Sequence, residues 1–281
     1  MTEPAVKPLK KQIELTDLKL PTISQQGMKA LEIINGDDLK FNELETAVSA
    51  DPMLMGILLK YANSPMYRKF VEIKNVRKAI SLLGVDIVKS AILICTMRSF
   101  CEPSNPGKEM LWEKSVHLAV LSKIIATKLF RKLAEEIELF AMMSQIGGLV
   151  LSTNFVDEYA TVVEQALEKN ISLEEQEHET FGVDRVDVTA YTLEKLRLPD
   201  IFISVLSSYF QNNIPEEIRS DTDQHIVILK LATLIIENEQ SEDHPNDKII
   251  SQLSDILGLE MLDVDGFIEE YNEKISEGFS F

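Results

Sequence analysis

Apolar residues recur at intervals of three and four along almost the whole chain, the spacing that places them on one face of an α-helix. A clear case is the run from Met53 to Tyr61, which follows Asp51-Pro52. Proline suits the first turn of a helix, where its missing N–H has no intrahelical partner anyway. No hairpin dipeptide lies between alternating apolar and polar residues. The pattern therefore predicts an all-α protein.

Helix-start and helix-stop signals divide this pattern into elements. Asn42 with Glu45, and Ser172 with Glu175, have the spacing of a capping box, so a helix is expected to begin at each. Asn75 and Gly84 bracket a short helix. Longer helices are expected over residues 85–100, 112–124, 135–150, 184–196, 201–210, 221–237, 248–257 and 263–277.

The longest stretch without a charged residue runs from Leu139 to Val156. Its length approaches that of a membrane span. Polar residues interrupt it, among them Gln145 and Asn154, and Gly147-Gly148 lies near its middle. A buried helix with a break, in which the glycines allow close helix packing, is therefore favoured over a membrane span.

The positions of turn- and linker-forming residues suggest two helical lobes. The polar residues 1–12 are expected to be flexible, and the Pro- and Gly-containing residues 103–108 to form a linker. This places a first lobe at 13–102 and a second at 109–212. Residues 213–281 are expected to complete the second lobe, because a segment of about seventy residues hardly supports a core of its own.

The charge of the chain narrows the classes of partner. The 281 residues include 46 acidic and 28 basic side chains, a net charge of −18. Coating nucleic acid or an anionic membrane needs a basic surface, so neither partner is expected. Residues 211–281 hold 17 of the acidic and 4 of the basic side chains, so most of the imbalance belongs to the C-terminal helices.

Cysteines and histidines show no catalytic or zinc-binding spacing. Two cysteines do not make a disulfide framework, and no signal peptide is visible, so a cytoplasmic location is expected. Cys95 is expected to be an inert core thiol and His117 a structural histidine. His178 has Glu174 one turn before it, but crowding by other glutamates favours a solvated helix face over a metal site. No phosphate-binding loop or nucleophile elbow is present.

One basic stretch interrupts the acidity, and only Glu72 opposes it in sequence. It consists of Arg68, Lys69, Lys74, Arg77 and Lys78. It could dock an acidic partner or a phosphorylated ligand. It could equally be a solvated helix face, as most charge runs are.

Several short motifs occur in a characteristic order. They are Leu20-Pro21-Thr22-Ile23, Val48-Ser49-Ala50-Asp51-Pro52, Leu58-Leu59-Lys60-Tyr61-Ala62-Asn63-Ser64, Ala79-Ile80-Ser81-Leu82-Leu83-Gly84, Leu111-Trp112, Phe181-Gly182 and Leu198-Pro199. This order, over roughly residues 15 to 212, resembles the HD-related output domain, the HDOD family. The resemblance implies an all-α fold of two packed lobes, the second like the HD phosphohydrolases, and a role in bacterial signalling.

The resemblance also marks where metal ligands would lie. Some family members keep a His-Asp pair, but Ser144 and Gln145 occupy those two positions here. Lys114 and Arg185 lie where the family often has histidine, and Tyr209 with Phe210 lies where a late histidine pair is usual. A divalent ion needs anionic or imidazole ligands, which a lysine and an arginine are not. We therefore expect no metal or other cofactor and a centre closed by hydrogen bonds.

The leading hypothesis is a non-catalytic signal-transduction module that binds a signalling protein or, alternatively, a cyclic-nucleotide messenger. The rival hypothesis is a divergent phosphohydrolase or phosphodiesterase acting on a phosphorylated or cyclic nucleotide. A DNA-associated regulator is a third reading, which the acidity of the chain opposes.

Overall fold

The computed structural model describes residues 12–36, 38–63, 72–100, 106–196, 198–211 and 214–276. These ranges contain helices and no strand, so the predicted all-α class is confirmed. The first lobe consists of α1 (Gln25–Ile34), α2 (Phe41–Ser49), α3 (Pro52–Asn63), α4 (Val76–Leu83) and α5 (Val85–Phe100). The larger lobe begins with α6 (Pro106–Leu129), α7 (Ala134–Met143), α8 (Ile146–Asn154) and α9 (Val156–Lys169). It continues with α10 (Leu173–Phe181), α11 (Arg185–Lys195), α12 (Asp200–Phe210), α13 (Asp221–Glu239), α14 (Asp247–Leu257) and α15 (Met261–Ser276).

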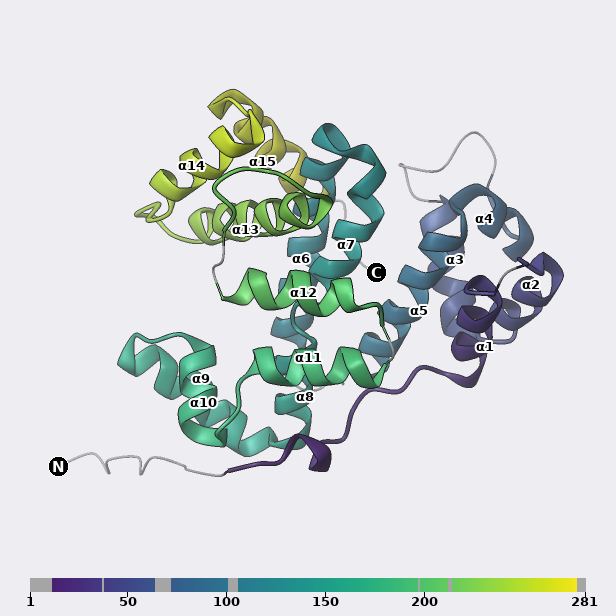
Figure 1. The fold of residues 1–281 in the computed structure, drawn as a ribbon, viewed down its shortest axis with the longest axis horizontal. Coiled ribbons are helices and arrows are strands. Elements are labelled where there is room, and N and C mark those ends of the chain that lie inside the picture. Colours follow the sequence, from purple (N-terminus) through teal and green to yellow (C-terminus); the bar gives the residue numbers. More distant parts are fainter. Residues whose placement is uncertain are drawn as a thin grey trace.

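Helix α5 joins the two lobes (Figure 1). Its apolar residues point in almost every direction, as expected for a helix that is covered on all sides. It packs against α1, α3 and α4 of the first lobe and against α7 and α8 of the second. One continuous apolar core therefore runs through both lobes.

Helix α6 is the axis of the second lobe. It packs against α7 and α8 and also against α13 and α15. The C-terminal helices α13 to α15 thus rest on the second lobe, at the opposite end from α9 and α10 (Figure 1). These three helices hold 11 acidic and 3 basic side chains, so part of the excess negative charge lies at this end.

Two motifs of the first lobe have structural roles. The Asp51 carboxylate accepts hydrogen bonds from the backbone N–H groups of Met53 and Leu54, both at 3.1 Å, and so caps α3. The Asn63 amide at the other end of α3 binds Ile73 twice, because it donates to the Ile73 carbonyl and accepts from the Ile73 N–H, each at 2.7 Å. Asp51 and Asn63 therefore fix both ends of α3.

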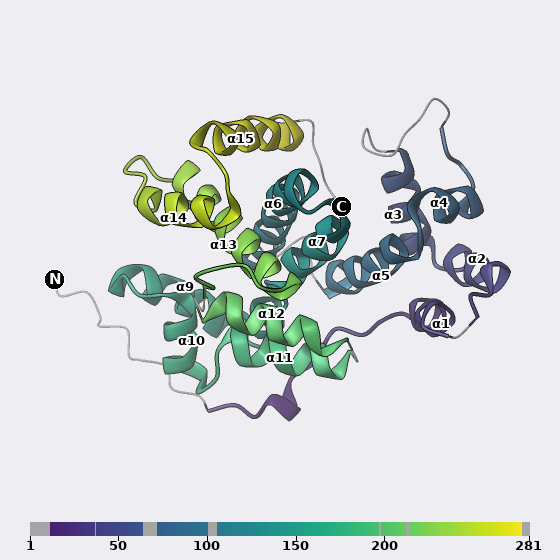
Figure 2. The ribbon, with the colours of Figure 1, turned by 45° about the horizontal axis from the view of Figure 1, so that its top comes forward.

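The chain crosses from one lobe to the other before α1, through a segment that we call the strap (Gln12–Leu20, including the 3-10 helix η1, Leu15–Asp17). The strap runs past α8 and α11 of the second lobe in Figure 1 and past α11 in Figure 2, and in both views it then reaches α1. Ile13 N–H donates to the Phe181 carbonyl at 3.0 Å. The Asn154 side chain accepts from Lys19 N–H at 2.8 Å and donates to the Lys19 carbonyl at 3.0 Å. Residues 13–20, which the sequence assigned to the first lobe, are thus bound to the second.

Three further expectations need correction. Residues 135–150 are not one helix, because α7 ends at Met143 and α8 begins at Ile146. The uncharged stretch from Leu139 to Val156 is therefore helical with a break, as the favoured interpretation predicted. Asn42 does not cap a helix, since α2 begins at Phe41 without a side-chain cap. Residues 106–108 of the expected linker belong to α6.

No single helix in the described ranges has both the length and the apolar character needed to cross a bilayer. The pair α4 and α5 meets those two criteria only when taken together, and the two helices are bent by 112° relative to each other. Of the expected flexible residues 1–12, only Gln12 lies within the described ranges.

Candidate functional site

The four positions expected to replace family metal ligands come from three parts of the second lobe. Ser144 and Gln145 form the break between α7 and α8, Arg185 begins α11, and Lys114 lies on α6. Arg185 Nη1 donates to Gln145 Oε1 at 3.3 Å, and Gln145 Nε2 donates to Ser144 Oγ at 3.4 Å. Ser144 Oγ donates to the Ala141 carbonyl at 2.7 Å. Three of the four positions are therefore joined in one chain of hydrogen bonds.

Arg185 is held chiefly by a buried carboxylate. Its Nε and Nη2 donate to Glu177 at 3.1 and 2.8 Å, and its backbone N–H donates to Glu177 Oε2 at 2.8 Å. Tyr159 accepts from Nη2 at 3.0 Å and donates to Glu177 Oε1 at 2.7 Å. Arg185, Glu177 and Tyr159 are at most 4% exposed. Burial alone lowers the pKa of Arg185, but the Glu177 carboxylate outweighs it and holds that pKa well above its ordinary value.

Two lysines and two glutamates lie outside this buried centre. Glu174 Oε1 lies 3.4 Å from Arg185 Nε. Lys114 keeps part of its side chain in solvent. Partial burial and the Arg185 charge lower its pKa, and they outweigh the negative charges of Glu174 and Glu237, which raise it. Burial likewise lowers the pKa of Lys230. The fourth expected position, Lys114, thus contributes to the rim of the centre through charge rather than through a direct bond to Arg185.

The expected late histidine positions are aromatic and lie on α12. The Tyr209 hydroxyl shares a hydrogen bond of 2.8 Å with Thr233 Oγ1, and burial raises the pKa of Tyr209 to about 12. The Phe210 ring packs edge-on against it, with ring centroids 5.1 Å apart. Lys230 Nζ lies 5.4 Å from the centroid of the Tyr209 ring.

The side chains of this centre do not fit a divalent ion. A metal ligand must offer a lone pair, and a guanidinium offers five donors and no acceptor. Arg185 occupies the space between Gln145, Tyr159 and Glu177, and its positive charge already neutralises the buried Glu177 carboxylate. Lys114 adds a second positive charge at the rim. The donor set therefore opposes cation binding.

Sequence reasoning missed Glu177 by grouping it with the glutamates of a solvated face. That interpretation is correct for Glu175 and Glu179, which are exposed, but wrong for Glu177, which is fully buried. The available signal was its position four residues before Phe181, since residues four apart share one face of a helix. Phe181 is also fully buried.

A second group of possible ligands lies at the surface. His178, Asp184 and Asp187 place one ligand atom each within 4.8 Å of one another. Asp184 and Asp187 already form the capping box that starts α11, where each accepts a hydrogen bond from a backbone N–H. This arrangement explains their proximity without an ion.

The basic stretch is only partly described, because Arg68 and Lys69 lie outside the described ranges. Lys74 pairs with Glu72 at 3.0 Å, and Arg77 pairs with Glu45 of α2. A second glutamate, remote in sequence, therefore also opposes the stretch. Exposed pairs of this kind contribute little to stability. Lys74, Arg77 and Lys78 all remain exposed.

His117 and Cys95 occupy structural surroundings. His117 Nδ1 and the Tyr271 hydroxyl are hydrogen-bonded, which ties α6 to α15. Cys95 is partly buried on α5, and burial together with the nearby Asp51 charge raises its pKa to about 12. Such a thiol is a poor nucleophile at neutral pH, because the thiolate is the reactive form.

Three solved structures share this architecture. An HDOD domain protein of unknown function from Geobacter sulfurreducens superposes with a TM-score of 0.68 at 18% identity, over 95% of this chain and 96% of that one. A candidate phosphohydrolase from Shewanella amazonensis gives 0.68 at 18% identity, over 91% of each chain. The MmoQ response regulator from Methylococcus capsulatus gives 0.52 at 24% identity, over 90% of this chain and 99% of that one. Comparison with curated proteins gives no significant match.

The two packed helical lobes define the class of this protein, an all-α module. The HDOD domain model matches residues 20–211, more than half of the chain. The chain belongs to the HDOD family.

Proposed function

We propose that this HDOD protein is a non-catalytic module of bacterial signal transduction that acts by binding a protein partner. The observation that carries the proposal is the Arg185 guanidinium, which fills the centre between Gln145, Tyr159 and Glu177 and satisfies their hydrogen bonds. A phosphohydrolase of the related type needs a metal to polarise phosphoryl oxygens and activate water. A buried cation at that point opposes metal binding.

Metal content and turnover test the non-catalytic part. Protein purified without chelator is expected to contain far less than one equivalent of Mn, Fe or Mg per chain by elemental analysis. With these metals added, a panel of cyclic dinucleotides and phosphomonoesters is expected to remain intact. One tightly bound equivalent, or turnover that Glu177→Gln abolishes, would overturn the proposal in favour of the divergent hydrolase.

The basic stretch is the proposed docking surface, because it groups five positive side chains within eleven residues of an acidic chain. Arg77 projects from α4 and remains exposed beside its partner Glu45. An acidic surface on a partner could replace such a weak local pair. Reversal of Arg68, Lys69 and Arg77 to glutamate is expected to abolish capture of a partner that co-purifies with the native protein.

A matched control is available in a second basic run. Lys128, Arg131 and Lys132 are exposed and lie near the end of α6, so their reversal changes the net charge equally. The control triple variant is expected to retain the partner. If both variants retain the partner, the basic stretch is not the docking surface. If both lose it, the loss is explained by the change in net charge rather than by the basic stretch.

A further inference from the structure

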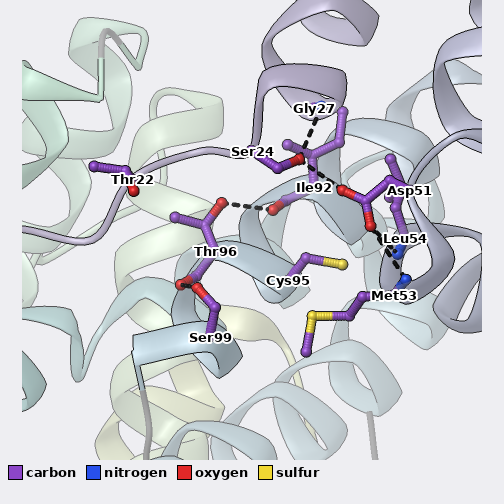
Figure 3. A pocket seen from close by; sticks show the side chains of 10 residues that line it. All are labelled: Thr22, Ser24, Gly27, Asp51, Met53, Leu54, Ile92, Cys95, Thr96 and Ser99. Atoms are coloured by element: carbon purple, nitrogen blue, oxygen red, sulfur yellow. Dashed lines mark hydrogen bonds between the residues drawn. The ribbon is translucent and has the colours of Figure 1, made fainter.

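The first lobe contains a cavity of about 190 Å³ next to α5 (Figure 3). Thr22 and Ser24, from the residues that join the strap to α1, form one wall, and Asp51 at the start of α3 forms another. Ile92 and Leu54, both buried, form an apolar floor. The cavity therefore lies where three separate segments of the first lobe meet.

Three of the four hydroxyl groups around this cavity, all except that of Thr22, donate their hydrogens to groups of the protein itself. Ser24 Oγ donates to Asp51 Oδ2 at 2.6 Å, Thr96 Oγ1 to the Ile92 carbonyl at 2.8 Å, and Ser99 Oγ to the Thr96 carbonyl at 2.8 Å. A hydroxyl has one hydrogen to donate and two lone pairs that accept. These oxygens can consequently offer only acceptors to a molecule in the cavity.

The Asp51 carboxylate has neutral partners only. It accepts from the backbone of Met53 and Leu54 and from the Ser24 hydroxyl. Within the described ranges it forms no ion pair with a lysine, arginine or histidine. Its charge acts within the cavity, because it contributes to the raised pKa of the Cys95 thiol, which also lines the cavity. A cation that carries N–H donors fits such a cavity, because its charge pairs with the carboxylate and its N–H groups find acceptors. An apolar part of the same ligand fits against Ile92 and Leu54.

We propose that this cavity binds a small organic ammonium ion, with its apolar group on Ile92 and Leu54 and its charged nitrogen beside Asp51. The volume corresponds to about six waters at roughly 30 Å³ each, and it is smaller than the roughly 300 Å³ at which drug-sized pockets begin. The ligand is thus an amine with a short apolar group. This site is independent of the docking surface and of the arginine-filled centre.

The test uses n-butylammonium as the probe, with n-butanol and butyrate as neutral and anionic analogues of similar shape. Met53 lines the cavity and its side chain is 43% exposed, so its methyl group is a local reporter. In the full chain labelled with ¹³C-methyl methionine, Met53→Leu identifies that resonance. Butylammonium is expected to shift it saturably, butanol to bind about tenfold more weakly, and butyrate to cause no saturable shift.

Asp51→Asn tests the charge without removing the helix cap, because asparagine caps helices as well as aspartate does. Asp184→Asn is the matched control, since Asp184 caps α11 in the same way and does not line the cavity. The Asp51 variant is expected to lose the roughly tenfold preference for butylammonium over butanol, and the Asp184 variant to keep it. Equal binding of all three probes to the native chain, no saturable shift of Met53, or an unchanged preference in Asp51→Asn would each overturn the proposal.

Discussion

At the scale of single residues, the second lobe is organised around a buried guanidinium. Arg185 bonds to Glu177 of α10, Tyr159 of α9 and Gln145 at the α7–α8 break, so one side chain links several helices. Its planar group presents donors in fixed directions, which a lysine could not reproduce. This guanidinium therefore gives the centre a specified geometry.

Glu177→Gln is expected to destabilise the protein by about 3–5 kcal/mol, because it leaves the Arg185 charge buried without its counter-charge. Glu179→Gln is the control on the same helix; Glu179 is exposed and pairs with Lys169, so a loss of at most about 1 kcal/mol is expected. Urea unfolding followed by circular dichroism measures both. Equal losses in the two variants would contradict the structural role of Glu177.

Cys95 should be alkylated slowly at neutral pH, because its pKa is raised to about 12. A raised thiol pKa favours the unreactive protonated form. In a Cys101→Ser background, the rate of iodoacetamide labelling is expected to rise about tenfold per pH unit between pH 8 and 11, since the thiolate fraction does so below the pKa. Intact-mass spectrometry measures the rate. A plateau near pH 9 would show an ordinary thiol instead.

At the scale of elements, the close approach of α8 and α11 depends on Gly147. A Cβ added there would lie 2.1 Å from the Arg185 carbonyl oxygen and 2.5 Å from Thr189 Oγ1. Gly147 N–H also donates to Thr189 Oγ1 at 3.2 Å. The expectation that the glycine pair permits close helix packing is therefore confirmed at this position, and the packing brings Arg185 to Gln145.

Gly147→Ala is expected to cost about 1–3 kcal/mol, because the new methyl group forces α8 and α11 apart. Gly56→Ala is the control: Gly56 lies within α3, and no atom lies within 4 Å of an added Cβ. Alanine there should stabilise the helix by about 0.5–1 kcal/mol. Thermal unfolding of both variants gives the comparison, and a stabilised Gly147 variant would refute the steric explanation.

Local signals located most helices but could not show what covers them. The bounds of α5, Val85–Phe100, match the expected range because an all-round apolar run with Gly84 before it depends on nothing remote. The break between α7 and α8 contacts Arg185 of α11, which lies 40 residues after Gln145. The burial of Glu177 also depends on α11, because Glu177 accepts hydrogen bonds from Arg185. The Asn42 signal failed because its amide oxygen accepts from Arg77 instead. Tertiary partners decided each of these cases.

At the scale of the whole molecule, the strap fixes the relation between the lobes. It is bound to α8 through Asn154 and to α10 through Phe181, and it leads directly into α1 of the first lobe. Residues 21–24, which join the strap to α1, then contribute Thr22 and Ser24 to the wall of the first-lobe cavity. The two lobes are thus joined through α5 and through the strap.

Asn154→Ala is expected to release the strap without unfolding either lobe, because it removes both side-chain bonds to Lys19. Hydrogen exchange should show loss of protection at the Lys19 amide, by about tenfold for a local cost near 1.4 kcal/mol. Asn272→Ala on the exposed face of α15 is the control and should leave that amide unchanged. Unaltered protection in Asn154→Ala would show that the strap is held by other contacts.

The strap also bears on how the chain folds during synthesis. Lys19 leaves the ribosome early, yet its partner Asn154 follows 135 residues later. At about 5–20 residues per second, that interval lasts roughly 7 to 27 seconds. Contacts so distant in sequence form late, since loop closure must precede them. The first lobe can therefore assemble on the ribosome while the strap remains undocked, and the strap joins the lobes only after α8 has been synthesised.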